Sequence, residues 1–114
     1  MGTWGYGPLD SDGAHDWISN LKAHTVLSKE IKKAFTARRL DYDAVRAAAV
    51  MMERAYEIDL LDPDDVRALT PYAISALEDL SDTQVIQAFD EPAAVQKSIR
   101  KQVEGLVELH ESLP

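Results

Sequence analysis

The chain has 114 residues, 46% of them hydrophobic, and its 20 acidic and 12 basic side chains give a formal net charge of -8. This length corresponds to one domain and excludes an enzyme built from a catalytic and a regulatory domain. The acidic balance argues against direct nucleic-acid binding, which needs a surplus of Lys and Arg, and the absence of cysteine excludes disulfides, Cys-ligated metals and thiol nucleophiles.

We therefore expect a single helical domain over residues 1–114, divided into an N-terminal segment 1–10 and a helical bundle 11–113. The longest apolar run, residues 47–52, is much shorter than the roughly 20 residues that span a membrane. We expect a cytoplasmic protein with no membrane contact.

The first 17 residues differ from the rest, because they hold four of the five glycines and both tryptophans. Glycine and proline shape a loop, and large aromatic side chains give it apolar surface. We predict an extended aromatic segment that packs on the helices as a structural clamp, with an exposed recognition loop as the alternative. The residues of this motif are Trp4, Gly5, Tyr6, Gly7, Pro8, Asp12 and Trp17.

After this segment, apolar residues recur every three or four positions, which predicts helices and no sheet. The first helix is expected to begin at Ser11 or Asp12 and to end near Ala23. Its predicted inner face consists of Ala14, Trp17, Ile18 and Leu21.

A second helix is predicted over 26–39, with Thr25 as its cap and most of a basic cluster on its outer face. A third helix is expected to begin at Asp41 and to continue to about Leu60. The predicted inner residues of these two helices are Leu27, Ile31, Ala34, Phe35, Val45, Ala48, Ala49, Met52 and Tyr56.

Three later helix starts are indicated by proline, which is favourable at the first helical position. They are Asp62-Pro63, Thr70-Pro71 and Glu91-Pro92. The expected elements are short helices over 62–69, 70–80 and 81–89 and a long last helix from Pro92. The last helix carries an apolar stripe of Val95, Ile99, Val103, Leu106 and Leu109 or Leu113.

The predicted fold is thus all-α, an irregular compact bundle of six or seven helices with the aromatic segment packed on it. Gly105 lies in the middle of the last helix. A glycine there costs about 1 kcal/mol relative to alanine, and we interpret it as a position of close packing.

The chain opens with Met1-Gly2-Thr3-Trp4-Gly5-Tyr6-Gly7-Pro8-Leu9 and continues through Asp12 to Asp16-Trp17. This opening resembles the start of a family of small, mostly bacterial proteins of unknown function, with a Met-Gly-x-Trp-Gly-x-Gly-Pro-Phe-type signature. Leu9 stands where the family has an aromatic residue. The resemblance covers residues 1–17, with a looser likeness over 47–53, and it implies no activity.

Patterns for catalysis or metal binding are incomplete. The run from Asp10 to Gly13 resembles part of a calcium loop, but Pro8 and Ser19 occupy its terminal ligand positions. His15 and His24 are too far apart to form an i, i+4 metal pair. We predict no catalytic residue, no metal and no cofactor.

The remaining candidate site is an acidic block, in which Leu60 and Leu61 are expected to be exposed or half-exposed. Such acids serve helix capping and solubility. Alternatively, they form an edge that attracts a basic partner surface. The acidic block consists of Glu57, Asp59, Asp62, Asp64 and Asp65.

From this block we predict a non-enzymatic interaction protein that binds, and inhibits or neutralises, a protein partner with a basic surface. An immunity or anti-defence inhibitor of bacteria or phages fits this description by analogy. One alternative is a homo-oligomeric structural module, such as a homodimer, packed through the stripe of residues 95–113 and through Met51 and Met52. Another is a small-molecule binder or enzyme with a pocket near Trp4, Tyr6, His15 and Trp17.

Overall fold

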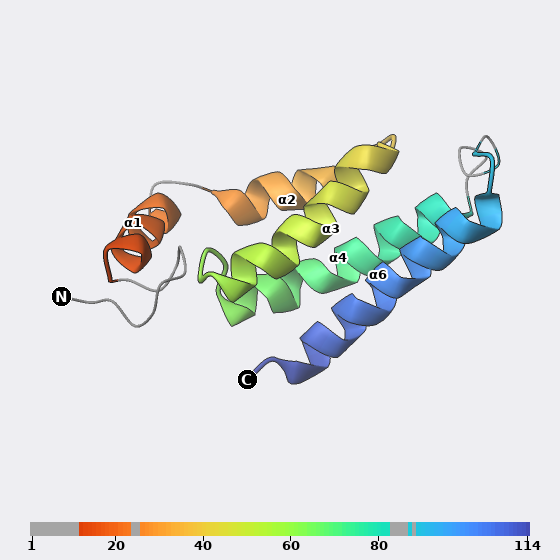
Figure 1. The fold of residues 1–114 in the computed structure, drawn as a ribbon. Coiled ribbons are helices and arrows are strands. Elements are labelled where there is room, and N and C mark those ends of the chain that lie inside the picture. The colour runs from red at the N-terminus through yellow and green to blue at the C-terminus, as the bar shows by residue number, and fades with distance from the viewer. Residues whose placement is uncertain (1–11, 24–25, 83–86, 88) are drawn as a thin grey trace.

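A computed structural model describes residues 12–23, 26–82, 87 and 89–114 of the chain. The described residues form five helices and no strand (Figure 1). The all-α prediction is therefore confirmed, whereas six or seven helices are not supported. The helices are α1 (Asp12–Ala23), α2 (Leu27–Thr36), α3 (Tyr42–Glu57), α4 (Pro63–Ser81) and α6 (Pro92–Ser112).

The helices from α2 to α6 run alternately in opposite directions and pack side by side (Figure 1). α3 and α4 are the central pair, because each packs against α2, against α6 and against the other. Fifteen buried apolar side chains fill the space between the four helices. They are Ile31, Phe35, Val45, Ala49, Met52, Ala55, Leu61, Val66, Leu69, Ala73, Ala76, Leu77, Leu80, Ile99 and Leu106.

The predicted break at Thr70-Pro71 is wrong, because α4 continues through Pro71 as one helix. Proline removes one helical hydrogen bond and disfavours a helix interior by about 3 kcal/mol. Here the buried side chains continue at helical spacing on both sides, from Val66 to Leu80. Burial of this long apolar face offsets the cost of the proline. The Thr70 hydroxyl also donates to the carbonyl of Val66 at 2.6 Å.

The predicted helix starts at Asp12, Asp41 and Pro92 agree with the structure. Asp41 caps α3, since its Oδ1 accepts from the amide of Ala44 at 2.9 Å. α2 ends at Thr36, earlier than predicted, and α3 ends at Glu57 instead of near Leu60. The expected short helix over 81–89 lies largely outside the described residues.

The end of α3 is a Schellman motif, in which the chain turns through a residue of left-handed conformation. Asp59 is that residue, with φ 64°. The amide of Asp59 donates to Tyr56 at 3.2 Å, and the amide of Leu60 donates to Ala55 at 2.7 Å. These bonds satisfy the last carbonyls of α3 and stop the helix at Glu57.

α1 lies to one side of the other four helices (Figure 1). Trp17 is 66% exposed, so its predicted place on an inner helix face is wrong. The side chains of the other predicted inner residues, Ala14, Ile18 and Leu21, lie outside the described residues. The predicted clamp also lies outside the described residues, because its motif residues do. These are Trp4, Gly5, Tyr6, Gly7 and Pro8.

None of the helices in the described part of the chain has both the length and the apolar character needed to cross a bilayer.

Candidate functional site

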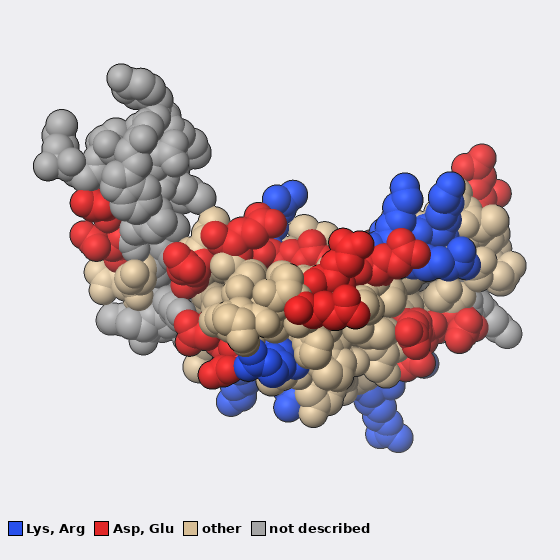
Figure 2. Space-filling view, turned by 90° about the horizontal axis from the view of Figure 1, so that it is seen from below, with Lys and Arg blue, Asp and Glu red and all other residues tan. Residues whose placement is uncertain are grey.

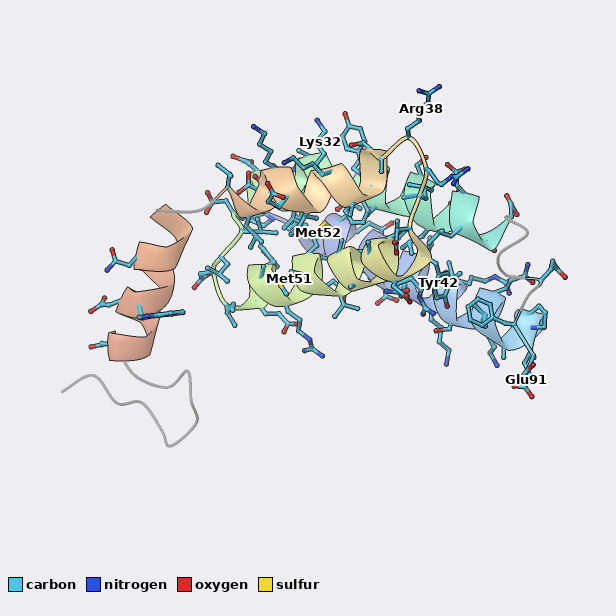
Figure 3. All side chains as sticks on the ribbon, turned by 90° about the horizontal axis from the view of Figure 1, so that it is seen from above. Lys32, Arg38, Tyr42, Met51, Met52 and Glu91 are labelled. Carbon is cyan, nitrogen blue, oxygen red and sulfur yellow. The ribbon has the colours of Figure 1, made fainter. Side chains whose placement is uncertain are left out.

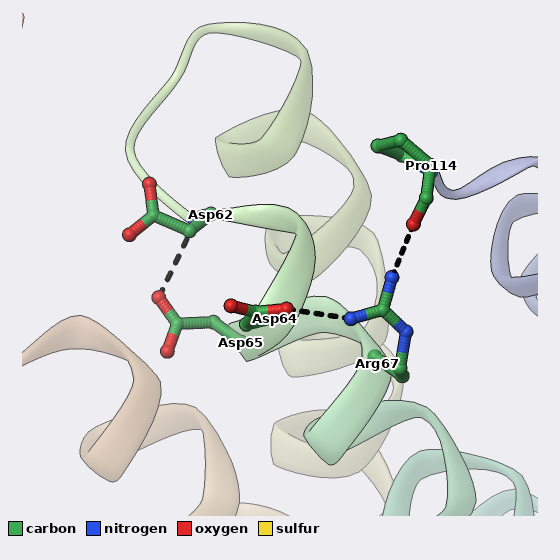
Figure 4. Close-up of polar contacts among 5 residues, drawn as sticks. All are labelled: Asp62, Asp64, Asp65, Arg67 and Pro114. Carbon is green, nitrogen blue, oxygen red and sulfur yellow. Dashed lines mark hydrogen bonds and ion pairs between the residues drawn. The ribbon is translucent and has the colours of Figure 1, made fainter.

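Two members of the acidic block serve as the cap of α4. Asp62 is the N-cap residue, and Asp65 three positions later completes a reciprocal capping box with it. The amide of Asp62 donates to Oδ2 of Asp65 at 3.3 Å (Figure 4). These two carboxylates are therefore used by the backbone of α4.

Two further members of the acidic block contact arginines. Asp64 accepts from Arg67 at 2.6 Å, and Arg67 also donates to the backbone oxygen of Pro114 at 2.5 Å, which ties the end of the chain to α4 (Figure 4). Glu57 pairs with Arg54 at 3.3 Å. Capping and local ion pairs thus account for four of the five acids.

The two leucines within the acidic block have different environments. Leu60 is half-buried, as expected. Leu61 is only 3% exposed and belongs to the core, so the prediction of an exposed or half-exposed Leu61 is wrong. The turn at Asp59 is the reason, because it directs the chain after α3 back across the bundle. The acidic block therefore has little apolar surface of its own to offer a partner.

A second group of acids faces a groove between α3 and α6, which we call the acidic groove. It has a volume of about 350 Å³, and the six described residues that line it include three carboxylates and no basic side chain. Only Glu57 was among the predicted site residues. The lining residues are Glu53, Glu57, Gly105, Glu108, Leu109 and Ser112.

One signal in the sequence points to part of this groove. Glu53 and Glu57 are four residues apart on one helix, so their like charges lie on the same face and repel each other. Glu108 is likewise four residues from Glu104 on one helix, but its place beside Glu53 and Glu57 follows only from the packing of α6 against α3.

One carboxyl group of the acidic groove has a raised pKa. Partial burial raises the pKa of the Glu53 carboxyl above its ordinary value of 4.5, and the negative charge of Glu57 raises this pKa further. The positive charge of Arg54 opposes both effects with a smaller lowering. Glu53 is thus held in a position that disfavours its charged form.

The helix ends add to this electrostatic cost. Glu57 is the last residue of α3, and Glu108 lies about one turn before the end of α6. The C-terminal end of a helix carries a partial negative charge, which makes a nearby carboxylate unfavourable. The groove therefore gathers negative charge where the fold itself does not favour it.

Gly105 lies next to Glu53 in the acidic groove. A Cβ atom at Gly105 would lie 3.5 Å from Oε1 of Glu53, which is an ordinary van der Waals distance. Alanine would therefore also fit there, and the predicted close packing at Gly105 is not supported by this contact.

Arg46 connects the two helices that form the acidic groove through hydrogen bonds that we call the Arg46 brace. From α3, its guanidinium donates to Oε1 of Gln102 at 2.6 Å and to the Ser98 hydroxyl at 2.5 Å, both on α6. It also donates to the Tyr42 hydroxyl at 2.8 Å. The amide of Gln102 returns a bond to the carbonyl of Arg46 at 3.2 Å. This network joins α6 to α3 by three side-chain hydrogen bonds.

The outer face of α2 is basic, as predicted, with exposed Lys29, Lys32 and Lys33. The Lys32 ammonium lies 4.7 Å from the centre of the Tyr72 ring on α4, and Lys33 pairs with Glu30 at 3.0 Å. Lys32 and Arg38 extend from α2 and from the loop after it (Figure 3). Figure 2 shows acidic side chains along the middle of one face of the molecule, with a basic cluster toward one end.

The structure gives no support to the two other kinds of candidate site, a metal site and an aromatic pocket, within the residues that it describes. Within the described ranges, no group of three or more His, Asp and Glu side chains is placed to hold a metal ion. Of the residues proposed for an aromatic pocket, Trp4 and Tyr6 and the side chain of His15 lie outside the described residues.

Comparison with known proteins gives a family and no function. A family model described as a domain of unknown function (DUF4259) matches residues 2–113. No curated protein and no solved structure matches the chain.

Proposed function

The chain belongs to the DUF4259 family, a domain of unknown function, and we propose that it is a non-enzymatic interaction protein that binds a basic surface of a protein partner. The acidic groove of α3 and α6 is the centre of the proposed binding site. The acidic block extends the site from Glu57 along the start of α4.

The single observation that carries this proposal is the arrangement of the groove carboxylates. Glu53, Glu57 and Glu108 line one groove, two of them near negative helix ends, and the pKa of Glu53 is raised by burial and by Glu57. Acids retained only for solubility need no such crowding. A Lys or Arg side chain of a partner would relieve the repulsion on binding.

Binding at this site would inhibit or neutralise the partner by covering its basic surface. Clustered charge also speeds the encounter of oppositely charged proteins, by 10-fold or more at low salt. The bacterial or phage setting, the cytoplasmic location and the immunity or anti-defence role belong to the same proposal and rest on the sequence alone.

The test is a binding experiment with a charge-neutral groove. The variant Glu53→Gln, Glu57→Gln, Glu108→Gln is compared with a control, Glu78→Gln, Asp79→Asn, Asp82→Asn, which removes the same charge at the far end of α4. Each protein is used to capture partners from host lysate at low and at high salt. We then measure the association rate of each captured protein.

We expect the groove variant to lose a salt-sensitive basic partner and to associate with it at least 10-fold more slowly at low salt. The control variant should keep the partner. Equal association of the two variants would place the binding site elsewhere and refute the proposal.

A second candidate function, a homodimer, retains support from one feature of α3. Met51 and the preceding Val50 are 49% and 48% exposed. Met52 is fully buried between the helices instead (Figure 3), and Ile99 and Leu106 of the stripe are buried in the core of the same chain. A dimer would therefore use the outer face of α3. Light scattering that gives a monomer at every concentration would exclude it.

A further inference from the structure

An apolar groove lies between α4 and α6, beside the site proposed above. It has a volume of about 290 Å³. Val107 is 38% exposed, although it is aliphatic, and Pro71 is exposed beside half-buried Ile74. The residues that line this apolar groove are Thr70, Pro71, Ile74, Val107, His110 and Glu111.

The C-terminal half of α6 separates the two grooves. In a helix with 3.6 residues per turn, residues 105, 108, 109 and 112 lie on one side and residues 107, 110 and 111 on the opposite side. The first set lines the acidic groove with α3, and the second set lines the apolar groove with α4. A single partner segment that crosses α6 would reach both.

Charge selects the occupant of the apolar groove. Glu111 lines the groove itself, and Glu104 and Glu108 are exposed on the outer surface of α6 next to it. These carboxylates repel an anionic ligand and attract a cationic one. A groove of this volume is at the lower limit of small-molecule sites, about 300 Å³, and it suits one large side chain that anchors a protein partner.

Resting on the function proposed above, we propose that the apolar groove of α4 and α6 receives an aliphatic or aromatic side chain of the same basic partner. The lysines or arginines beside this anchor contact the carboxylates of α6 and reach the acidic groove. The partner is therefore recognised by a basic segment that also carries an apolar anchor. A purely polar basic tail lacks that anchor.

The test uses two fluorescein-labelled peptides with the same number of lysines. One also contains leucine, and the other has serine in place of leucine. Fluorescence anisotropy measures the Kd of each peptide for the full chain, for Val107→Ser and for Val50→Ser. Val50 is the matched control, because it is an exposed valine on α3 outside the apolar groove. Circular dichroism checks that both variants fold.

We expect the wild-type chain to bind the leucine peptide about tenfold more tightly than the serine peptide, a difference of about 1.4 kcal/mol. Val107→Ser should reduce this preference to less than about threefold, whereas Val50→Ser should keep it. Equal affinities of the wild type for the two peptides, or equal effects of the two variants, would overturn the inference. A concentration-dependent dimer that Val107→Ser abolishes would also overturn it, because a second copy would then occupy the groove.

The same anisotropy assay, carried out also on the groove variant of the proposed function, separates this inference from that function. If the serine peptide binds at low salt and the groove variant Glu53→Gln, Glu57→Gln, Glu108→Gln weakens it, the proposed function stands, whatever leucine adds. If leucine then adds nothing, only the apolar anchor is refuted. If neither peptide binds the wild-type chain at low salt, both proposals fail.

Discussion

Replacement of Arg46 by methionine tests the brace that positions the acidic groove. Methionine keeps an unbranched apolar stem of similar length and removes the guanidinium. The change deletes the bonds from Arg46 to Gln102, Ser98 and Tyr42, of which the first and last are partly buried and the second is exposed.

The expected magnitude follows from these three bonds. A typical intramolecular hydrogen bond contributes about 1 kcal/mol net, and a bond to a charged group contributes more when it is buried. We assign about 1 kcal/mol to each of the two partly buried bonds and little to the exposed one, so Arg46→Met should lower the free energy of unfolding by about 2 kcal/mol. With an unfolding entropy of about 2.1 cal/mol/K per residue, this corresponds to a fall in Tm of about 8 °C.

Urea unfolding followed by circular dichroism at equilibrium measures the free energy, and a thermal scan measures Tm. Arg54→Met is the control, because the Arg54 side chain is 72% exposed and pairs only across the surface with Glu57. It should change stability by no more than about 0.5 kcal/mol. Arg46→Lys should recover only part of the loss, since one ammonium lacks the fork geometry of a guanidinium. If Arg46→Met costs no more than Arg54→Met, the brace does not hold α6 on α3.

Three further predictions concern the turn after α3 and the groove. Asp59→Gly should stabilise the protein by up to about 1 kcal/mol in urea unfolding, because glycine adopts the positive φ of this Schellman position without the strain of a Cβ atom. The control Asp59→Ala should give no gain. If Asp59→Ala stabilised the protein as much as Asp59→Gly does, the backbone argument would be contradicted. Gly105→Ala should stabilise the protein by about 0.5–1 kcal/mol through helix propensity, since the new methyl group contacts Glu53 at an ordinary distance. A loss of stability would mean that α6 and α3 need to lie closer together at this position than alanine allows. Glu53→Gln should be more stable than the wild type at neutral pH, because the raised pKa of Glu53 means that its charge destabilises the folded state. As the pH falls through the raised folded-state pKa of Glu53, the folded wild type binds a proton before the unfolded chain does and gains stability. The stability difference between the two proteins should therefore shrink and vanish below about the ordinary pKa value of 4.5. Urea unfolding at a series of pH values measures this difference, and a difference that is constant with pH would show that the charge of Glu53 is not its cause.

The helix starts were the most predictable part of the fold. Asp41 and Asp62 precede α3 and α4 as N-caps, and Pro92 begins α6. Caps act within one turn of the chain, so a single sequence contains the information that they need. The apolar spacing likewise identified buried residues such as Met52 and Ile99, since a helix repeats its faces at a known period.

The error at Pro71 shows where local signals fail. The same Xaa-Pro pattern begins a helix at Pro63 and lies inside one at Pro71. The difference is the buried face of α4, which continues past Pro71 against α2, α3 and α6. Contacts with other helices therefore outweigh a local preference of about 3 kcal/mol.

The candidate site, like the fold, was predictable from the sequence only in part. The sequence by itself determined an all-helical, acidic chain and a crowded group of carboxylates that includes Glu57, because composition, helical period and capping are local properties. Only the tertiary structure showed that Glu53 and Glu108 share a groove, and that Val107 lies open on the other side of α6. Each of these facts depends on which side of α6 faces α3 and which faces α4. That orientation depends on the packing of helices that are far apart in the chain, and the Arg46 hydrogen bonds join the same two helices.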